Sequence, residues 1–294
     1  MTDAGLKVWL NGRILLAEDA RLSVFDHGFL YGHGVFETMR AYSGQVFLLR
    51  EHLQRLRASA SLLRIPLDLS DDAAARAIAS LLRENRLADA YVRLTVSRGP
   101  GPIGMRGAFG APSVLIFAKP LALPPAEAYA QGRDLCILQT RRNTPETGVR
   151  VKSLNFLNSL AGAWEAADRG YAEGMMLDGE GHIAEGTVSN LFFAERERLW
   201  TPSLDTGILP GVTRAYVIRL AHELGIAVAE ARFGVERLAD FTEAFTTNSL
   251  TEIVPVRSVD GHVFPLCPGP LTRRLMEAYA RRRDGEKGEL QDGV

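Results

Sequence analysis

Residues 149–158 have the sequence VRVKSLNFLN and place a single lysine, Lys152, among small polar and apolar neighbours. An amphipathic helical pattern begins directly after this stretch. A lysine in such a setting is a candidate Schiff-base amine. Because most lysines are solvated surface charges, this stretch needs support from other parts of the chain.

Length and charge limit the classes of partner. The 294 residues, about twice a usual domain, predict two domains, and 46% hydrophobic residues are enough for two sizeable cores. The 34 basic and 35 acidic side chains give a net charge of -1, without long runs of either sign. This pattern has no electrostatic footprint for nucleic acid or an anionic membrane, so we expect a small-molecule ligand.

The cysteines and histidines indicate the cellular compartment and whether a metal site is expected. Cys136 and Cys267 form no CxxC pair and no secretory leader pattern is present, which favours a reducing compartment and predicts a cytoplasmic protein. No apolar run approaches the length of about 18 residues that spans a membrane. The six histidines form no HxxxH or HxH group, so we expect no metal site.

The N-terminal part is predicted to begin with a hairpin. Asn11-Gly12 separates two apolar runs within residues 8–16, and these two residue types tolerate the positive φ that a tight turn requires. Further on, the periodicity of apolar residues distinguishes helices from strands, and Ser70 is a predicted N-cap. The expected elements are helices at 51–64 and 71–87, strands at 91–97 and 113–118, and a long loop at 99–112.

A proline-rich segment marks the predicted domain boundary, because proline stiffens the backbone and cannot donate a ladder hydrogen bond. We expect a small N-terminal α/β domain at 1–119, a linker at 120–126, a large C-terminal cofactor-binding domain at 127–283, and a disordered polar tail at 284–294. Within the large domain we expect strands at 135–139, 174–178, 188–194 and 244–247, and helices at 159–169, 214–224 and 271–283.

Several residues suit a phosphate-bearing, pyridine-containing cofactor. Val212 and Thr213 precede a predicted helix and offer backbone amides at its N-terminus, where anions bind. Asn248 and Ser249 offer further donors after a β-rich run, and Arg55 is a candidate phosphate ligand. Each of these patterns alone also fits an ordinary helix junction, a turn or a solvated arginine.

Glu185 is a second type of candidate. A carboxylate held against a pyridine nitrogen favours the protonated ring, which then acts as an electron sink. Glu185 ends a short predicted strand before Gly186 and lies 33 positions after Lys152. That spacing allows a helix and a returning strand between the two residues.

Taken together and in order, the motifs resemble the class IV, or fold-type IV, pyridoxal-phosphate enzymes. The resemblance covers about Phe25 to Thr272. The stretches that carry it are FDHGFLYGHGVFET (25–38), EHLQRL (51–56), VRVKSLNFLN (149–158), IAEGTVSNL (183–191), ILPGVTR (208–214) and FTTNSLTEIVPV (245–256).

This resemblance implies a two-domain α/β (α+β) fold like that of D-amino-acid and branched-chain aminotransferases, with pyridoxal 5′-phosphate as cofactor and a homodimer as the assembly. It makes Lys152 the residue that forms the internal aldimine and shuttles the proton, and Glu185 the partner of the pyridine nitrogen. It makes Arg55, Val212, Thr213, Asn248 and Ser249 the phosphate ligands. The chain departs from many members at Phe156, where they carry a tyrosine that hydrogen-bonds the cofactor O3′.

The resemblance leaves two reaction types open. The stretches RRNTPE (141–146), TPSLDTGIL (201–209) and Asn248-Ser249-Leu250 are closest to aminodeoxychorismate lyases, in which a threonine matching Thr38 is thought to help proton transfer. Ile103 counts against the lyase, because some lyases carry an arginine there. The remaining substrate-binding candidates are Tyr31, Arg98, which is shared with D-amino-acid transaminases, and Arg40, which suits branched-chain transaminases. We therefore predict a lyase that forms 4-aminobenzoate and pyruvate, with a transaminase acting on D-amino acids, branched-chain amino acids or (R)-amines as the alternative.

Overall fold

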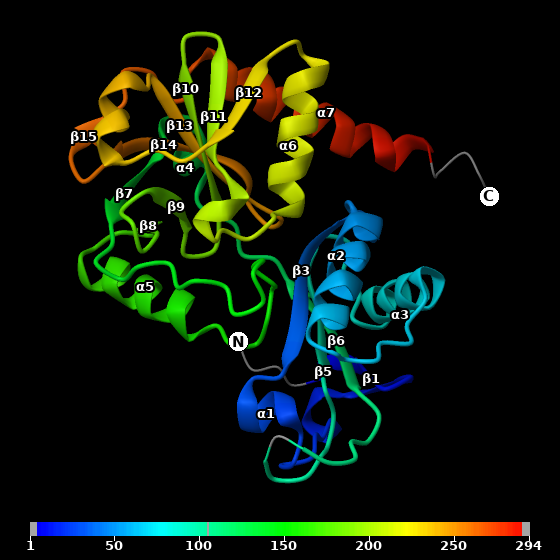
Figure 1. The fold of residues 1–294 in the computed structure, drawn as a ribbon. Coiled ribbons are helices and arrows are strands. Elements are labelled where there is room, and N and C mark those ends of the chain that lie inside the picture. The colour runs from blue at the N-terminus through cyan, green and yellow to red at the C-terminus, as the bar shows by residue number, and fades with distance from the viewer. Residues whose placement is uncertain (1–4, 105, 290–294) are drawn as a thin grey trace. The chain divides into compact units, whose positions relative to one another are not determined.

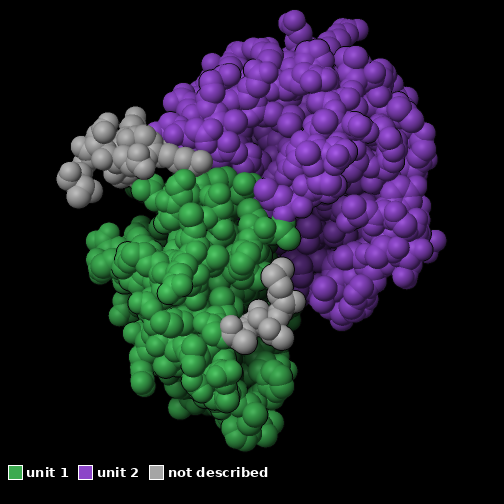
Figure 2. All heavy atoms as spheres, turned by 180° about the vertical axis from the view of Figure 1, so that it is seen from behind, with its two compact units in different colours: residues 1–122, 151–155 green, residues 123–150, 156–294 purple. Residues whose placement is uncertain are grey.

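The computed structural model describes residues 5–104 and 106–289. The chain folds into two compact units, coloured separately in Figure 2. Unit 1 comprises Met1–Ala122 and Val151–Asn155, and unit 2 comprises Leu123–Arg150 and Phe156–Val294. The short segment around Lys152 therefore belongs with the N-terminal unit, although the predicted C-terminal domain at 127–283 includes it. The predicted linker at 120–126 stays a prediction.

Unit 1 contains a six-stranded antiparallel sheet in the order β2-β1-β6-β5-β3-β4 (Figure 1). Its strands are β1 (Lys7–Leu10), β2 (Arg13–Leu16), β3 (Gly34–Tyr42), β4 (Gln45–Val46), β5 (Ala90–Ser97) and β6 (Ser113–Pro120), and its helices are α1 (His27–Tyr31), α2 (Leu49–Leu62) and α3 (Asp71–Glu84).

Local sequence explains the ends of these elements. Asn11 and Gly12 have φ values of 48° and 90°, so the predicted hairpin turn between β1 and β2 is confirmed. Ser70 caps α3 by accepting a hydrogen bond from the Ala73 amide at 3.2 Å, as predicted. Helix α3 ends at Glu84, three residues before the predicted end, because the chain reverses at Arg86 with φ of 55°.

One face of this sheet is covered by α2 and α3 (Figure 1). Alternate residues of the central strands point to opposite faces, and the helix-covered face holds the apolar core. That core includes Val35, Met39, Val92, Leu94 and Ile116, each 0% exposed. The other face of β3 therefore presents Phe36, Thr38 and Arg40.

Unit 2 is built on a mixed sheet in the order β12-β11-β10-β13-β14-β7-β8-β9, with β15 paired to β14. Its strands are β7 (Arg133–Ile137), β8 (Gly174–Leu177), β9 (Ile183–Gly186), β10 (Asn190–Glu195), β11 (Arg198–Pro202), β12 (Ala227–Ala231), β13 (Glu243–Asn248), β14 (Glu252–Val259) and β15 (His262–Val263). Its α-helices are α4 (Ala126–Gln131), α5 (Leu157–Asp168), α6 (Val212–Glu223) and α7 (Pro270–Glu289).

The predicted elements of unit 2 are present with shifted ends, including the short strand at Glu185, which is β9. The elements that were not expected are α4, β11, β12, β14 and β15. β11 and β14 each contain a proline, and β15 has only two residues. Such segments carry little periodic signal.

Helix α7 continues to Glu289, six residues into the predicted tail at 284–294. Arg283 pairs with Glu252 of β14 at 2.7 Å and with Asp284 at 3.0 Å, which anchors this end of the helix. Residues 290–294 of the predicted tail lie outside the described residues.

A search of the described residues finds no helix that is long and apolar enough to cross a membrane. Within the same residues, no group of three or more His, Cys, Asp and Glu side chains is arranged to hold a metal ion.

Candidate functional site

Lys152 lies on a short extended segment that docks on the start of β3. The Phe36 amide donates to the Lys152 carbonyl at 2.9 Å, and the Leu154 amide donates to the Gly34 carbonyl at 2.9 Å. These bonds form an isolated antiparallel bridge between Val35 and Ser153. The backbone of Lys152 is therefore fixed by the edge of β3, which explains why this segment belongs to unit 1.

Two glycines of the 25–38 stretch make this docking sterically possible. A Cβ on Gly34 would lie 2.5 Å from the Leu154 side chain and 2.7 Å from the Val96 carbonyl oxygen. Gly32 has a φ of 65°, and a Cβ there would meet the Asn155 side chain. Glycine is thus required at both positions for the Lys152 segment to reach the strand.

The Lys152 amine lies over an aromatic ring. Its Nζ is 4.7 Å from the ring centroid of Phe36, and the Arg93 guanidinium carbon is 3.7 Å from the same centroid. Phe36 is only 3% exposed, so its ring is a fixed platform. Cation–π contacts of this kind hold a cationic amine in place. Lys152 therefore has both its backbone and its side chain positioned by β3.

A buried ionic cluster lies on the helix-covered face of the same strand. Glu37 of β3 accepts from Arg55 Nε at 2.8 Å and from Arg55 Nη2 at 2.6 Å, in a bidentate pair. His52 Nδ1 lies 2.7 Å from Glu37 Oε2. His52 and Arg55 come from one face of α2, three positions apart. Glu37 is 0% exposed, and the Arg55 side chain is 12% exposed.

The charges of this cluster follow from its contacts. Burial raises the pKa of Glu37, but the Arg55 charge and its hydrogen bonds outweigh that effect and lower the pKa to about 2. Burial lowers the pKa of His52 below its usual value. Near neutral pH, Glu37 is therefore ionised and His52 is neutral, with the Nδ1 hydrogen donated to the carboxylate. The cluster holds one positive and one negative charge.

Unit 2 contains a second buried carboxylate pair, centred on Glu185 at the end of β9. Its Oε1 accepts from Arg142 Nε at 2.7 Å and from Arg142 Nη2 at 2.5 Å. Its Oε2 accepts from Asn190 Nδ2 at 3.1 Å and from the Leu209 amide at 3.0 Å. Glu185 is 3% exposed and Arg142 is 8% exposed. The carboxylate is thus held in one orientation by donors on both oxygens.

Other contacts fix Arg142 in turn. Its Nη1 donates to Ser159 Oγ at 3.0 Å and to Asn158 Oδ1 at 3.2 Å, both on α5. Since α5 follows the Lys152 segment directly in the chain, its first turn determines where the guanidinium lies. Glu185 therefore depends on a support that begins only a few residues after Lys152.

The N-terminus of α6 provides a set of donors suited to an anion. Gly211 is its N-cap and has no side-chain cap, so the amides of Val212 and Thr213 begin the helix. The Thr213 hydroxyl lies 3.4 Å from the Ser249 hydroxyl, in the turn between β13 and β14. A Cβ on Gly211 would lie 2.0 Å from Asn190 Oδ1, so only glycine allows this close approach.

The Asn248 side chain lies in the turn that follows β13. Its Oδ1 accepts from the Leu250 amide at 2.9 Å, the Thr251 amide at 2.8 Å and the Thr251 hydroxyl at 3.0 Å. This oxygen therefore closes the turn that presents Ser249. The predicted role of Asn248 and Ser249 as phosphate ligands stays a prediction.

The substrate-binding candidates lie in unit 1. Thr38 and Arg40 share the face of β3 that carries Phe36, and Thr38 is paired directly with Arg93 of β5. Tyr31 Oη accepts from the Gly104 amide at 2.8 Å. Arg98 donates to the Gly110 carbonyl at 3.1 Å and lies 4.2 Å over the Phe109 ring. Tyr31 and Arg98 thus hold the glycine-rich loop.

The predicted residues fall into two groups by unit. Tyr31, Thr38, Arg40, Arg55, Arg98 and Lys152 belong to unit 1, and Glu185, Val212, Thr213, Asn248 and Ser249 belong to unit 2. Four residues that organise these groups had no predicted role: Glu37, His52, Arg142 and Asn190. A charged residue on the apolar face of an alternating strand was the one available signal for Glu37, because such a position needs a buried partner.

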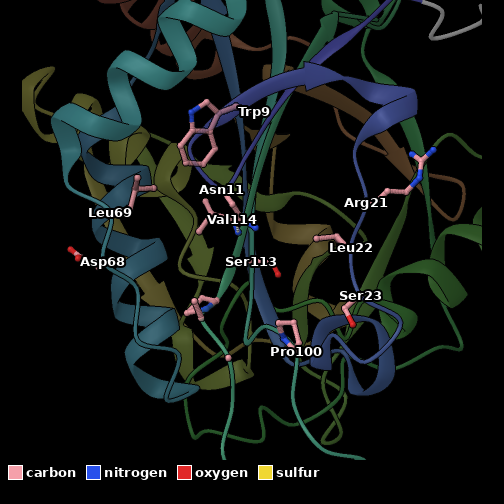
Figure 3. Close-up of a pocket in the computed structure, with 13 residues that line it drawn as sticks. Trp9, Asn11, Arg21, Leu22, Ser23, Asp68, Leu69, Pro100, Ser113 and Val114 are labelled. Carbon is pink, nitrogen blue, oxygen red and sulfur yellow. Dashed lines mark hydrogen bonds between the residues drawn. The ribbon is translucent and has the colours of Figure 1, made fainter.

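A separate hollow of about 510 Å³ lies in unit 1 (Figure 3). Trp9, Leu69 and Val114 form apolar parts of its lining, and Arg21 and Asp68 are charged groups at it. The Arg21 guanidinium donates to the carbonyls of Glu18 and Ala20. None of the predicted site residues lines this hollow.

Comparisons with known proteins identify the family of this chain. The family model described as amino-transferase class IV matches residues 34–259. An aminodeoxychorismate lyase of Bacillus subtilis is 37% identical over 277 residues, which cover 93% of this chain and 94% of that protein.

Solved structures give the same result for the fold. A branched-chain amino acid aminotransferase of Escherichia coli has a TM-score of 0.88 and 38% identity, with 93% of each chain covered. A second branched-chain amino acid aminotransferase, solved with pyridoxamine 5′-phosphate, has a TM-score of 0.85 and 30% identity over 93% of this chain and 92% of that chain. The predicted fold type is confirmed.

Proposed function

Since the chain belongs to the amino-transferase class IV family, we propose that it is a pyridoxal 5′-phosphate enzyme that converts 4-amino-4-deoxychorismate to 4-aminobenzoate and pyruvate. The family prediction made from the sequence is thereby confirmed. Relatives of this chain include both aminodeoxychorismate lyases and branched-chain aminotransferases. The preference for the lyase over the aminotransferase therefore depends on the face of β3 that carries Phe36, Thr38 and Arg40.

The donor sets of the two units fit the cofactor. In this proposal Lys152 supplies the amine that binds the cofactor aldehyde, Glu185 faces the pyridine nitrogen, and Val212, Thr213 and Ser249 hold the phosphate with Arg55. Asn248 acts by shaping the Ser249 turn. The bound cofactor withdraws electrons from the carbon that carries the substrate amine. Glu185 supports this with an orientation fixed by Arg142 and Asn190.

The position of Thr38 is the observation that supports the lyase reaction. Its side chain lies on the same face of β3 as Phe36, whose ring is 4.7 Å from the Lys152 amine. A hydroxyl two residues from Phe36 can donate a proton to the ether oxygen that leaves with the enolpyruvyl group, while the Lys152 amine removes the ring hydrogen. The atoms of the substrate then equal those of the two products, so no second substrate is needed.

The cations on this face suit the substrate of the lyase. Arg40 lies beside Thr38 on β3, and Arg93 is paired with Thr38 across the strands. Aminodeoxychorismate carries two carboxylates, one on the ring and one on the enolpyruvyl group, and guanidinium groups bind carboxylates strongly. The two arginines therefore match both ends of a dicarboxylate.

A branched-chain transaminase is the second candidate. Phe36 is buried and gives an apolar wall beside the Lys152 amine, which suits an aliphatic side chain. The Escherichia coli branched-chain enzyme is 38% identical over 288 residues, covering 95% of this chain and 93% of that protein. Transamination requires a 2-oxo acid as amino acceptor, so the two candidates differ in their demand for a second substrate.

The deciding experiment gives the purified enzyme aminodeoxychorismate alone and measures 4-aminobenzoate and pyruvate. We expect equal amounts of both without any 2-oxo acid. Parallel reactions contain L-leucine or D-alanine with 2-oxoglutarate. Glutamate formation in these reactions, with no aminobenzoate from aminodeoxychorismate, would replace the lyase by a transaminase.

A Thr38→Val variant tests the residue on which the preference for the lyase reaction depends. Valine keeps the shape but removes the hydroxyl, so we expect the lyase rate to fall roughly 10²-fold with unchanged cofactor absorbance. The control is Thr242→Val, which removes a hydroxyl bonded to the Ala194 carbonyl at 3.3 Å in unit 2. An unchanged rate in Thr38→Val would remove Thr38 from the mechanism.

In this proposal the enzyme acts as a homodimer. Large apolar side chains are exposed in unit 1 at Phe25, Phe29 and Ile103, and on α5 at Leu157 and Trp164. Exposed groups of this size are typical of surfaces that another chain covers. Light scattering should give about twice the 32.2 kDa chain mass, and a 32.2 kDa particle would contradict the dimer.

A cytoplasmic location completes the proposal. Cys136 and Cys267 are free thiols, which suits a reducing compartment.

A further inference from the structure

We infer that Glu37 is the positioning residue that orients Arg55 toward the cofactor phosphate, with His52 as its second support. The inference rests on the proposed role of Arg55 as a phosphate ligand. It concerns residues of unit 1 alone and adds a support that acts through Arg55. Neither Glu37 nor His52 has a part in the reaction proposed above.

The strand makes Glu37 a rigid anchor. β3 pairs with β5 through eight consecutive residue pairs, from Gly34 with Ser97 to Ala41 with Ala90. Glu37 lies inside this ladder, and its carboxylate points to the face covered by α2 and α3. The side chain is 1% exposed, so the surrounding core leaves the carboxylate little freedom to move.

The bidentate geometry transfers this rigidity to Arg55. Glu37 Oε1 accepts from Nε, and Glu37 Oε2 accepts from Nη2, at 2.8 and 2.6 Å. Two parallel bonds fix the plane of a guanidinium as well as its position. The pair uses the Nε and Nη2 edge of the guanidinium. A long side chain held in this way loses its conformational freedom before any ligand binds.

His52 fixes the carboxylate rather than the arginine. Its Nδ1 donates to Glu37 Oε2 at 2.7 Å, and it is 2% exposed. The imidazole comes from the same helix as Arg55, so α2 contributes a donor to the carboxylate at two positions. A neutral His52 adds a hydrogen bond without adding a charge, which leaves Arg55 as the cation of the cluster.

Two opposite effects of Glu37 on phosphate binding can be separated. Its negative charge opposes the approach of a phosphate dianion, whereas its fork holds Arg55 in a single orientation. If charge dominated, removing the carboxylate would strengthen phosphate binding. If positioning dominates, as the buried fork indicates, the same change weakens it.

The test compares pyridoxal 5′-phosphate with pyridoxal, which lacks the phosphate. The full-length enzyme, freed of cofactor, is titrated with each compound, and the dissociation constants are obtained from visible absorbance. For Glu37→Gln we expect pyridoxal 5′-phosphate to bind roughly tenfold more weakly, as is common when a supporting partner of a ligand is lost. Pyridoxal binding should stay unchanged. Equal weakening of both compounds would reveal a structural role only, and unchanged or tighter phosphate binding would also overturn the inference.

A cycle with Arg55→Ala separates this inference from the proposed function. Arg55→Ala should lose the preference for the phosphorylated compound, and adding Glu37→Gln should then have no further effect on it. If Arg55→Ala keeps the preference, both the proposed role of Arg55 and the inference fail. If Arg55→Ala loses it but Glu37→Gln keeps it, only the inference fails. A further loss in the double variant would show that Glu37 acts independently of Arg55, which also overturns the inference.

Two other variants keep the test decisive if Glu37→Gln does not fold. Glu37→Asp keeps the charge but shortens the side chain by one methylene, so the fork cannot form and the phosphate preference should fall. His52→Gln should produce a smaller loss in the same direction. Unchanged preference in both would overturn the inference. Glu84→Gln is the matched control, because Glu84 pairs with Lys7 at 2.6 Å with 48% of its side chain exposed and should leave both affinities unchanged.

Discussion

Each unit contains a buried glutamate–arginine pair, and the two pairs differ in which partner is the proposed ligand of the cofactor. In unit 1, Glu37 and Arg55 form a fork at 2.6 and 2.8 Å, and the arginine is the proposed ligand. In unit 2, Arg142 contacts one oxygen of Glu185 at 2.5 and 2.7 Å, and the carboxylate is the proposed ligand. The same ion pair can thus present a cation to a phosphate or an anion to a ring nitrogen.

The supporting groups explain this difference. Glu37 lies in the core face of a strand and receives a neutral histidine, so the arginine is the more exposed partner, at 12%. Arg142 is held by Ser159 and Asn158 of α5, so the arginine is the buried support. A buried ion pair is weak evidence for net stability, and its value here is orientation.

Lys152→Ala should have the largest effect, because it removes the amine common to both reaction types. We expect turnover to fall at least roughly 10³-fold and the visible absorbance of the lysine-bound cofactor to disappear. Both ion pairs should stay intact, since the Lys152 segment docks on β3 through its backbone. Lys7→Ala, which removes a surface lysine, is the control. Substantial turnover in Lys152→Ala would refute its assigned role.

Replacing the functional member of the unit 2 pair comes next. Glu185→Ala should keep some cofactor but lower turnover on the order of 10²-fold, because the ring nitrogen loses its oriented carboxylate. Steady-state kinetics with a cofactor titration measures both effects. Near-wild-type turnover would contradict the proposal that Glu185 is the member of the unit 2 pair that contacts the cofactor.

Removing the arginine from either pair tests whether the two are equally buried. Arg142→Met and Arg55→Met should each lower the free energy of unfolding by roughly 3 kcal/mol, because a buried carboxylate is left without its counter-ion. Denaturant unfolding measures this. Arg282→Met is the control, since Arg282 pairs with Glu223 at 2.9 Å on the surface and should change stability by less than about 1 kcal/mol. A small effect at Arg142 or Arg55 would argue against a buried pair.

Acid should act on the unit 1 pair through Glu37. Its pKa is about 2 in the folded protein and about 4.5 ordinarily. The folded state therefore gains stability that is complete above about pH 4.5 and is lost as the pH falls toward 2. We expect Glu37→Gln to remove this part of the acid dependence, about 3 kcal/mol between those pH values. Unfolding curves from pH 2 to 5 measure it, and parallel curves for both proteins would be inconsistent with the low pKa.

Phe156→Tyr should have the smallest effect. Phe156 is the point where the chain passes from the Lys152 segment of unit 1 into unit 2 and is the N-cap residue of α5. A tyrosine there restores the hydroxyl that many family members have, so we expect a shift in the visible absorbance with less than about tenfold change in turnover. A large loss of activity would instead indicate that the position is packed too tightly for a hydroxyl.

Local chemistry was enough to predict many elements. The Asn11-Gly12 turn and the Ser70 cap each depend on a few neighbouring residues, and both are present. Strands β11 and β14 were missed because their pairing partners are distant and their prolines weaken the local pattern. The α7 helix extends past its predicted end at 283, through a polar stretch that has no helical pattern of apolar residues.

The candidate site divides in the same way. Lys152, Glu185 and the N-terminus of α6 were identifiable because each motif carries its chemistry locally and the motifs occur in order. The placement of Lys152 against β3 was not, because it depends on Gly32 and Gly34 allowing close approach of a segment more than one hundred residues later.

Residue type and order alone were sufficient to predict the family, the cofactor and a set of candidate residues. The folded chain was needed to show that Lys152 belongs to the N-terminal unit, that Glu37 and His52 hold Arg55, and that Arg142 and Asn190 hold Glu185. Such supports join residues that are distant in sequence, and a buried charge is stable only where the fold brings its partner within hydrogen-bonding distance.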